Sequence, residues 1–572
     1  MLNASKSLAW PSILIPVLMM GLRASAQNVT TSQYDNARSG ANRVETILTP
    51  RNVNVRQFGK LFTLKVDGDV YAQPLFLAGL EIPGKGRHDV LFVATEHDSV
   101  YAFDAYGHPA VPLWHVSFLR KGVTTVPEDD VECPFIAPEV GITSTPVIDA
   151  DTGTLYVLAR TKELTGSPSG HYTQRLHALD VTTGLEKFGG PGAIRATING
   201  RGAGSQSGKV EFDPLRENAR AALLLANGSV YLTWGSSCDV GPYHGWVMAY
   251  DAQTLKQKAV FNASPDADDG GFWAGDTGPA ADEKGHLFLA AGNGRFDAAS
   301  GGRDYGDSLL KLDGQSLKLH DYFAPFNVAE LDAKDNDLGS GGPVLLPAQP
   351  GAHPHLVVIA GKGGTIYLID RDHMGHYQPN NDSHAVQAIP SPGGGVYGSM
   401  AYWNHNLYVL SNSDHDALRQ FTVHDGRLAL KAASGSRFPA ISATPAISAN
   451  GLRDGVLWVL HSRAWNADDT NAVLFAYDAL DTARLLYVSE QNPSRDRTGL
   501  ALRFNIPIIA NGHVYLGAKR EVDVYGLLSQ ETARKCAMTE NSSALYFPSS
   551  FDIAAPAGIP RRRANLHLGC QD

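Results

Sequence analysis

Residues 359–375 read IAGKGGTIYLIDRDHMG, and this stretch decides the fold. Its apolar start predicts a buried strand, a lysine and two glycines then form a tight turn, and a second apolar strand ends in Tyr-x-x-Asp. The same plan recurs along the whole chain. The closing strands of the eight units reach Asp104, Asp180, Asp251, Asp313, Asp370, Asp425, Asp478 and Tyr525.

Short β-branched and aromatic runs separated by Gly, Asn and Asp turns predict an all-β chain, because no stretch has sustained helical periodicity. Short antiparallel strands repeated eight times, each unit buried only against its neighbours, are what a β-propeller requires. We therefore predict an eight-bladed propeller of four-stranded antiparallel blades over residues 58–527. The strand FGKLFTLKV, from Phe58, would complete the last blade and leave no long exposed edge. A stacked β-solenoid is the alternative, but its repeats are shorter and more uniform.

The N-terminus has the pattern of a signal peptide. Lys6 precedes the apolar stretch Ser12–Leu22, and Ala24-Ser25-Ala26 is a small-x-small cleavage sequence. We predict a signal peptide over residues 1–26, cleavage near Ala26, and a periplasmic or secreted protein without stable membrane insertion. Residues 27–57 would form a lead-in to the propeller.

Export makes the four cysteines candidates for disulfides. We expect Cys133 to pair with Cys238, since both lie in loops of the ring, and Cys536 with Cys570, since both lie in the C-terminal tail, residues 528–572. Sequence alone allows three pairings, and free buried thiols are a further alternative. The tail is predicted to be pinned by its own disulfide.

The charge of the chain argues against nucleic acid as a partner. The formal net charge is −10, and the one basic run, Arg561–Arg563, is short. The sequence also contains no HExxH, Gly-x-Ser-x-Gly, P-loop or Cys-x-x-Cys-His motif. Protease, hydrolase, nucleotide-dependent and built-in cytochrome functions are therefore not supported.

Two segments resemble a known family. YDNARSGAN, from Tyr34, is followed by LTPRNVNVRQFGKLF, and Ala178–Phe188 fits Ala-x-Asp-x-x-Thr-Gly-x-x-x-Trp, with phenylalanine in place of the tryptophan. In this signature aspartate and threonine form a self-bonded turn, and the last aromatic packs between adjacent sheets. The chain resembles the quinoprotein (PQQ-dependent) alcohol dehydrogenase-like eight-bladed propellers, and in particular the exported bacterial PQQ-like repeat proteins.

The resemblance implies a cofactor site. WGSSCDVGPYHGW is similar to a segment with an acidic calcium ligand, here Asp239, and a basic-Gly pair, here His244-Gly245. AAGNGRFD is similar to a turn whose asparagine, here Asn293, ligates the metal. Asp335 in LDAKDNDLG matches the catalytic aspartate and the remaining metal ligand, with Asp332 and Asp337 as competitors. Calcium would take these hard oxygen ligands.

Other matched residues would contact the quinone. Lys362 in AGKGG matches the basic residue beside the quinone oxygens, with Asn293 and His244 as further contacts. Trp273 stands slightly before the family's stacking tryptophan, and Cys133 stands alone where the family has an adjacent cysteine pair. Asp335 would take the alcohol proton while hydride moves to the cofactor, and Lys362 would stabilise the developing negative oxygen.

Two functions follow. The first is an exported quinoprotein dehydrogenase that oxidises an alcohol or sugar with PQQ and calcium and passes electrons to a separate acceptor. The second is a non-catalytic propeller scaffold that binds a protein, a glycan or a cell-envelope component. Each site residue also has a structural interpretation: Asn293 as a turn residue, the aspartates as a solvated loop, Lys362 as an exposed lysine on a turn, and His244 as a structural or channel-lining residue.

Overall fold

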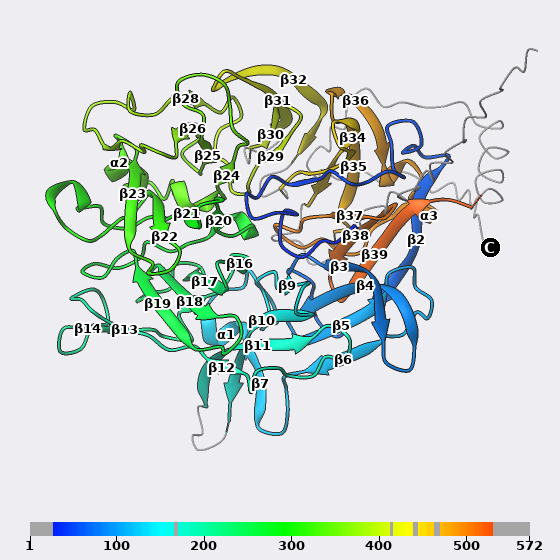
Figure 1. Cartoon of the computed structure of the whole chain (residues 1–572), viewed down its shortest axis with the longest axis horizontal. Helices are drawn as coiled ribbons and strands as arrows, with labels where there is room; N and C mark the ends of the chain where they lie inside the picture. The colour runs from blue at the N-terminus through cyan, green and yellow to red at the C-terminus, as the bar shows by residue number, and fades with distance from the viewer. Residues whose placement is uncertain (1–26, 165–169, 412–415, 439–443, 463–469, 530–572) are drawn as a thin grey trace, which may run out of the picture.

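The computed structural model describes residues 27–164, 170–411, 416–438, 444–462 and 470–529. In these residues, eight sheets of four or more strands surround a common centre, as Figure 1 shows. The predicted all-β, eight-bladed propeller is therefore confirmed. The predicted signal peptide and the predicted Cys536–Cys570 pair lie outside the described residues. No helix in the described ranges is long and apolar enough to cross a membrane.

We number the blades in chain order. Blade 1 comprises β3 (Leu75–Ile82), β4 (Gly86–Thr95), β5 (Ser99–Asp104) and β6 (Trp114–Ser117). Blade 2 comprises β7 (Val123–Pro127), β8 (Glu139–Val140), β9 (Val147–Asp149), β10 (Thr154–Glu163), β11 (His171–Asp180) and β12 (Gly192–Ala193). Blade 3 comprises β15 (Glu217–Asn218), β16 (Leu224–Ala226), β17 (Ser229–Ser236), β18 (Trp246–Asp251) and β19 (Gln257–Asn262). Blade 4 comprises β20 (Ala280–Ala281), β21 (His286–Ala290), β22 (Leu309–Asp313), β23 (Leu319–Ala324) and β27 (His376–Tyr377).

The second half of the ring follows the same plan. Blade 5 comprises β24 (Val344–Leu345), β25 (Leu356–Ala360), β26 (Thr365–Asp370) and β28 (Gln387–Pro390). Blade 6 comprises β29 (Ala401–Trp403), β30 (Asn406–Leu410), β31 (Asp416–His424) and β32 (Arg427–Phe438). Blade 7 comprises β33 (Ala446–Asn450), β34 (Arg453–His461), β35 (Val473–Asp478), β36 (Asp481–Val488) and the short β1 (Ala41–Asn42). Blade 8 comprises β37 (Ile508–Ala510), β38 (His513–Ala518), β39 (Glu521–Leu527) and β2 (Phe58–Lys65).

Short elements lie in the loops within and between the blades. They are the hairpin β13 (Thr197–Asn199) and β14 (Lys209–Glu211), the helices α1 (Glu128–Val131), α2 (Val328–Ala333) and α3 (Pro493–Asp496), and the 3-10 turns η1 (Ala274–Asp276), η2 (Ala298–Ser300), η3 (Leu338–Ser340) and η4 (Ser489–Gln491).

The N-terminal strand closes the ring. β2 pairs antiparallel with β39, as the sequence indicated, so the first long strand of the chain completes the last blade. An ion pair between the half-buried Lys60 and the buried Asp523 reinforces this closure, with Lys60 Nζ 2.6 Å from Asp523 Oδ1. β2 thus covers the outer edge of β39 and is itself the outermost strand of blade 8.

Residues 27–42 form what we call the N-terminal hoop, a segment that crosses the middle of the ring in Figure 1 and contacts all eight blades. On blade 1, Val29 and Phe76 exchange backbone hydrogen bonds. One strand of each of five other blades donates a backbone N–H group to a hoop carbonyl at 2.7 to 2.9 Å: Ile148 to Thr30, Ala281 to Asn36, Leu345 to Ala37, Tyr402 to Ser39 and Ile447 to Gly40. These bonds satisfy strand groups that face the centre of the ring.

Side chains of the hoop reach the remaining two blades. Asn36 Nδ2 donates to the carbonyl of Leu225 on blade 3, and Asn42 Nδ2 donates to the carbonyl of Ile509 on blade 8. Arg38 is completely buried and donates to Thr31 Oγ1 and to three carbonyls, those of Ser32, Leu223 and Pro279. The hoop therefore connects every blade to one continuous segment.

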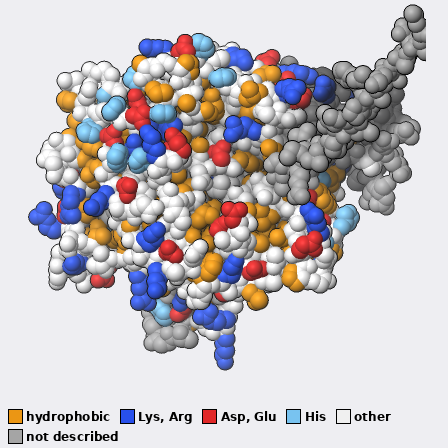
Figure 2. Space-filling model, in the orientation of Figure 1, with side chains coloured by type: hydrophobic (Ala, Val, Ile, Leu, Met, Phe, Trp, Pro, Cys, Tyr) orange, Lys and Arg blue, Asp and Glu red, His pale blue; other side chains and the backbone are white. Residues whose placement is uncertain are grey.

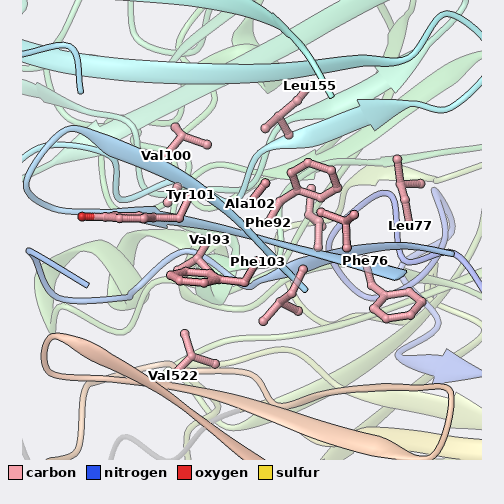
Figure 3. Packing of buried hydrophobic residues seen from close by; sticks show 14 of the residues in the cluster. Phe76, Leu77, Phe92, Val93, Val100, Tyr101, Ala102, Phe103, Leu155 and Val522 are labelled. Carbon is pink, nitrogen blue, oxygen red and sulfur yellow. The ribbon is translucent and has the colours of Figure 1, made fainter. Parts of the chain in front are cut away.

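Apolar side chains fill the space between neighbouring blades. In Figure 3, Phe92 and Phe103 of blade 1 lie between Leu155 of β10 and Val522 of β39. Each of these side chains is at most 3% exposed, and burial of a side chain of this size contributes about 1.5–3 kcal/mol. Repeated around the ring, this packing explains why strands apolar on both faces were so prominent in the sequence.

The turn in the segment Ala178–Phe188 has the predicted hydrogen bonds, but its last aromatic residue does not have the predicted packing. Asp180 Oδ1 accepts hydrogen bonds from the N–H groups of Thr182 and Thr183. Phe188, however, is 38% exposed and does not pack between sheets. Trp114 of β6 occupies the space beside the turn instead, and its Nε1 donates to the carbonyl of Val181. The predicted docking role of Phe188 was wrong.

Figure 2 shows one face of the molecule, on which basic and acidic side chains are scattered among apolar and uncharged ones. Surface charges of both signs are thus interspersed on this face.

Candidate functional site

A partly open cavity of about 160 Å³ lies among the loops on one face of the ring. These loops belong to or lead into blades 2, 3, 4, 5, 6 and 8. Six of the residues singled out in the sequence line the cavity: Cys133, Cys238, Asp239, Trp273, Asp337 and Lys362. They come from blades 2, 3, 4 and 5, so only the closed ring brings them together.

Lys362 lies at the centre of a polar cluster. Its Nζ is 2.5 Å from Asp337 Oδ2 and 2.7 Å from Asp335 Oδ1. Asn293 joins the same carboxylates, since its Nδ2 donates to Asp335 Oδ1 and its backbone N–H donates to Asp337 Oδ1. Lys362, Asp337, Asp335 and Asn293 thus form one polar network, although Asn293 is far from the others in the sequence.

Asp337, and not Asp335, is the aspartate that faces the cavity. The side chain of Asp337 is 6% exposed and lines the cavity, whereas that of Asp335 is 68% exposed and does not. The third acid of the loop, Asp332, accepts a hydrogen bond from the backbone of Gly294. The structure thus places Asp337, rather than the predicted Asp335, where a ligand in the cavity would meet it, and a catalytic role for either aspartate stays a prediction.

Burial and charge set the protonation of this pair. Burial raises the pKa of Asp337, and the Lys362 ammonium only partly offsets this effect. Burial lowers the pKa of Lys362, but the carboxylates of Asp337 and Asp335 outweigh it and raise that pKa. Lys362 consequently stays cationic at neutral pH.

Cys133 and Cys238 form a disulfide, which confirms the first predicted pairing. It connects the loop that follows α1 in blade 2 with the β17–β18 loop of blade 3, and both sulfur-bearing residues line the cavity. Disulfides are typical of oxidising compartments. The two cysteines are 105 residues apart in the sequence.

Loss of this disulfide is expected to destabilise the protein. Replacing both Cys133 and Cys238 with serine removes a long-range constraint on the unfolded chain, so the free energy of unfolding should fall by about 2–4 kcal/mol. Denaturant unfolding of the variant and of the wild type, both under oxidising conditions, measures the loss. Equal stability of the variant and the oxidised wild type would contradict this prediction.

Trp273 provides a flat wall of the cavity. Its ring packs directly on the backbone of two glycines: a Cβ atom at Gly235 would lie 2.9 Å from the indole, and one at Gly292 would lie 2.8 Å from Nε1. Glycine at both positions is what permits this close approach. Trp273 thus lines the cavity, and its contact with a quinone stays a prediction.

His244 does not line the cavity. Its ring nitrogens lie 2.9 Å and 3.0 Å from the carbonyl oxygens of Ser264 and Ala203, and the residue is buried. These contacts hold two loops together beneath the site. The prediction of His244 as a cofactor contact is therefore corrected to a structural role.

The three predicted calcium ligands do not form one ligand set. Asn293 is bonded to Asp335, but Asp239 accepts hydrogen bonds from Tyr243 Oη and Ser236 Oγ. Among the described residues, no group of three or more His, Cys, Asp or Glu side chains is arranged to hold a metal ion. Lys362 supplies the positive charge beside the carboxylates, so these residues do not fit a bound cation.

Several cavity residues could not be found from sequence motifs. The guanidinium of Arg503 lies 3.7 Å from the centre of the Phe135 ring, and that of Arg220 lies 4.1 Å from the centre of the Phe504 ring. Tyr397 lies beside Lys362, at 5.7 Å from Nζ to the ring centre. All five line the cavity. They come from loops within blades 2 and 3 and from loops that lead into blades 6 and 8, where no repeat signature marks them.

Comparison with known proteins gives structural matches alone, since no family model and no curated protein matches the chain. Quinohemoprotein alcohol dehydrogenase ADHIIG from Pseudomonas putida HK5 has a TM-score of 0.59 and 14% identity, over 88% of this chain and 80% of that one. The quinohemoprotein alcohol dehydrogenase from Comamonas testosteroni has a TM-score of 0.56 and 14% identity, over 87% and 80%. A europium-containing methanol dehydrogenase has a TM-score of 0.56 and 13% identity, over 88% and 98%. The chain thus shares the eight-bladed propeller fold of these alcohol and methanol dehydrogenases.

Proposed function

We propose that this protein is a quinone-dependent dehydrogenase that oxidises an alcohol in the cavity described above. The observation that carries this proposal is the meeting of Trp273, the Cys133–Cys238 disulfide and the Lys362–Asp337 pair in one cavity. The fold shared with alcohol dehydrogenases supports it. An oxidising compartment suits a protein with this disulfide, and we propose the periplasm or the exterior as its location.

The cavity residues fit a flat, anionic quinone such as PQQ. Trp273 supplies an aromatic plane, the disulfide supplies an apolar sulfur surface, and Lys362 supplies a cation. A cavity of about 160 Å³ encloses roughly one aromatic ring. A fused-ring quinone would therefore be only partly enclosed. When bound, a quinone supplies a two-electron acceptor for hydride.

The side chains that line the cavity would have different roles in the reaction. Asp337, as the carboxylate, would take the hydroxyl proton of the alcohol, and its raised pKa makes it a better base than an exposed aspartate. Lys362 would hold that carboxylate in place and stabilise oxygen atoms that gain negative charge. Trp273 would exclude water from the reacting face. The sequence has no haem-attachment motif, so a separate acceptor would remove the electrons.

A titration of the purified protein with PQQ tests this proposal, with absorbance and melting temperature as the signals. We expect saturable binding, and at 100 times the Kd a stabilisation of about 2.7 kcal/mol. Lys362→Met removes the cation and should weaken PQQ binding at least tenfold. A factor of ten corresponds to about 1.4 kcal/mol of binding free energy. Lys334→Met is the matched control, since Lys334 is 61% exposed and pairs only with Glu330 among the described residues.

A second arm of the titration addresses calcium. The residues do not fit a bound cation, so PQQ affinity should be the same with calcium and with a chelator. Asn293 Oδ1, which is buried and has no hydrogen-bond partner within the described residues, is an observation that favours a cation here. Calcium-dependent affinity that is lost in Asn293→Ala would overturn our assignment. Absence of PQQ binding at high micromolar concentration would remove the dehydrogenase and leave a scaffold propeller that binds a protein or glycan of the cell envelope.

A further inference from the structure

Ser340 is a cavity residue that has no part in the reaction described above. It lines the cavity, is 5% exposed and ends the 3-10 turn η3. Its Oγ accepts the backbone N–H of Lys362 at 2.9 Å. Its one hydroxyl hydrogen faces two carbonyl oxygens, that of Asp337 at 2.9 Å and that of Val396 at 3.1 Å. This hydroxyl therefore joins the backbones of both members of the Lys362–Asp337 pair.

The two glycines beside Ser340 allow its hydroxyl to reach this place. A Cβ atom at Gly339 would lie 2.5 Å from the backbone nitrogen of Gly292, and one at Gly341 would lie 1.8 Å from the carbonyl oxygen of Ala360. Both distances are shorter than a carbon atom tolerates, so only glycine lets the segment pass here. The sequence Gly-Ser-Gly thus places one hydroxyl between the β21–β22 loop and the end of β25.

Val396 extends this arrangement to the loop that leads into blade 6. Its backbone N–H donates to the carbonyl of Gly361 at 2.9 Å, and its own carbonyl oxygen lies 3.1 Å from Ser340 Oγ. The next residue, Tyr397, lines the cavity with its ring centre 5.7 Å from Lys362 Nζ. Ser340 therefore lies where three loops of the cavity wall meet.

The position of these backbones matters because the charged pair acts through geometry. Lys362 Nζ lies 2.5 Å from Asp337 Oδ2, although the two residues belong to different loops. A long lysine side chain has many rotamers, so its place is set by its own backbone and by the groups around it. A displacement of about 1 Å in an active site can lower a rate by about two orders of magnitude. A group that fixes both backbones thus influences the site more than its own hydrogen bonds suggest.

We propose that Ser340 is the positioning residue of the Lys362–Asp337 pair. Its hydroxyl holds the two backbones in the relative position in which the ammonium and the carboxylate act on one ligand. Ser340 works through these two residues and transfers no proton itself. Its role in the reaction rests on the proposed function, whereas its effect on the backbone of the pair does not require a quinone.

Titration with PQQ tests the role of Ser340 in the cofactor site. Ser340→Ala removes the hydroxyl and should weaken PQQ binding by about tenfold, because Lys362 is no longer held in place. The absorbance spectrum of bound PQQ should change as well. Ser340→Thr keeps a hydroxyl and should bring affinity and spectrum back close to those of the wild type. Equal affinity and an equal spectrum in the wild type and Ser340→Ala would overturn the proposal.

Ser489→Ala is the matched control that separates positioning from stability. Ser489 is completely buried at the start of η4, its Oγ accepts the backbone N–H of Leu474 at 3.1 Å, and it does not line the cavity. Both alanine variants lose a buried hydroxyl, so their melting temperatures should fall by similar amounts. Only Ser340→Ala should change PQQ binding. A similar loss of PQQ affinity in both variants would assign the effect to stability and contradict the proposal.

Hydrogen exchange measured without PQQ provides an independent test. The Lys362 N–H donates to Ser340 Oγ and to the carbonyl of Asp337, so its exchange in Ser340→Ala should be faster by about tenfold. Ser489→Ala should leave this exchange unchanged. Unchanged exchange of Lys362 in Ser340→Ala would contradict the proposal.

The two measurements distinguish failure of this inference from failure of the proposed function. Faster exchange in Ser340→Ala together with no PQQ binding by the wild type would overturn the dehydrogenase alone. PQQ binding by the wild type, with unchanged affinity and exchange in Ser340→Ala, would overturn this inference alone. Circular dichroism checks that each variant is folded. If Ser340→Ala does not fold, Ser340→Cys replaces it in both tests, since a thiol is a weaker donor and acceptor than a hydroxyl.

Discussion

Replacing Arg38 with methionine is expected to lower the free energy of unfolding by about 3–6 kcal/mol. Methionine has a similar length but donates no hydrogen bond, so the carbonyls of Ser32, Leu223 and Pro279 lose their donor in a fully buried place. Each unpaired buried carbonyl costs about 1–3 kcal/mol. Urea unfolding followed by fluorescence measures the change.

Two further variants separate the causes. Arg38→Lys keeps the positive charge but replaces the planar guanidinium with a single ammonium group. Its free energy of unfolding should therefore lie between those of the wild type and the methionine variant. Arg51→Met changes an arginine that is 81% exposed and should cost less than about 0.5 kcal/mol. A loss below about 1 kcal/mol in Arg38→Met would show that Arg38 is not needed to anchor the hoop.

The stability of the protein should fall as the pH rises from about 4.5 to about 8, and Glu96 should be a main cause. Glu96 is 1% exposed; Oε2 accepts hydrogen bonds from Gly141 and Thr143, and Oε1 has no partner within the described residues. Burial raises its pKa to about 8, well above the usual range of a glutamate. Across this window the unfolded chain has released the proton and the folded protein retains it.

The sign follows from proton linkage. The unfolded state binds fewer protons than the folded state, so the free energy of unfolding decreases with pH, by up to about 1.4 kcal/mol per pH unit from this one group. The contribution is complete below the unfolded pKa and is lost as the pH approaches 8. Unfolding measured at several pH values gives the slope.

Glu96→Gln should flatten this slope, because glutamine stays neutral and still accepts the bond from Gly141. Glu81→Gln, which changes an exposed glutamate of β3, should leave the slope unaltered. A Glu96→Gln profile parallel to that of the wild type would mean that Glu96 is not the group that titrates.

The fold was predictable because its signal is local and repeated. Each closing strand ends in the same pattern, and eight copies of it require a ring. The hoop was not predictable, since its bonds, many of them made by backbone groups, have partners that are distributed over hundreds of residues.

The site was predictable in part for the same reason. Lys362, Asn293 and Trp273 lie next to recognisable strands, and the structure brings Lys362 and Asn293 into one network. Asp335 and Asp337 differ by two residues in a loop, and only burial distinguishes them. Arg220 and Arg503 belong to loops whose meeting depends on ring closure.

The hoop changes how the repeats share their stability. In most repeat proteins a unit interacts only with its neighbours, so unfolding proceeds unit by unit along the array. Here each blade is also bonded to residues 27–42, so the loss of one blade weakens a segment on which all the others depend. The described ring should therefore melt in a single cooperative transition, and a series of shortened chains should contain no stable partial ring.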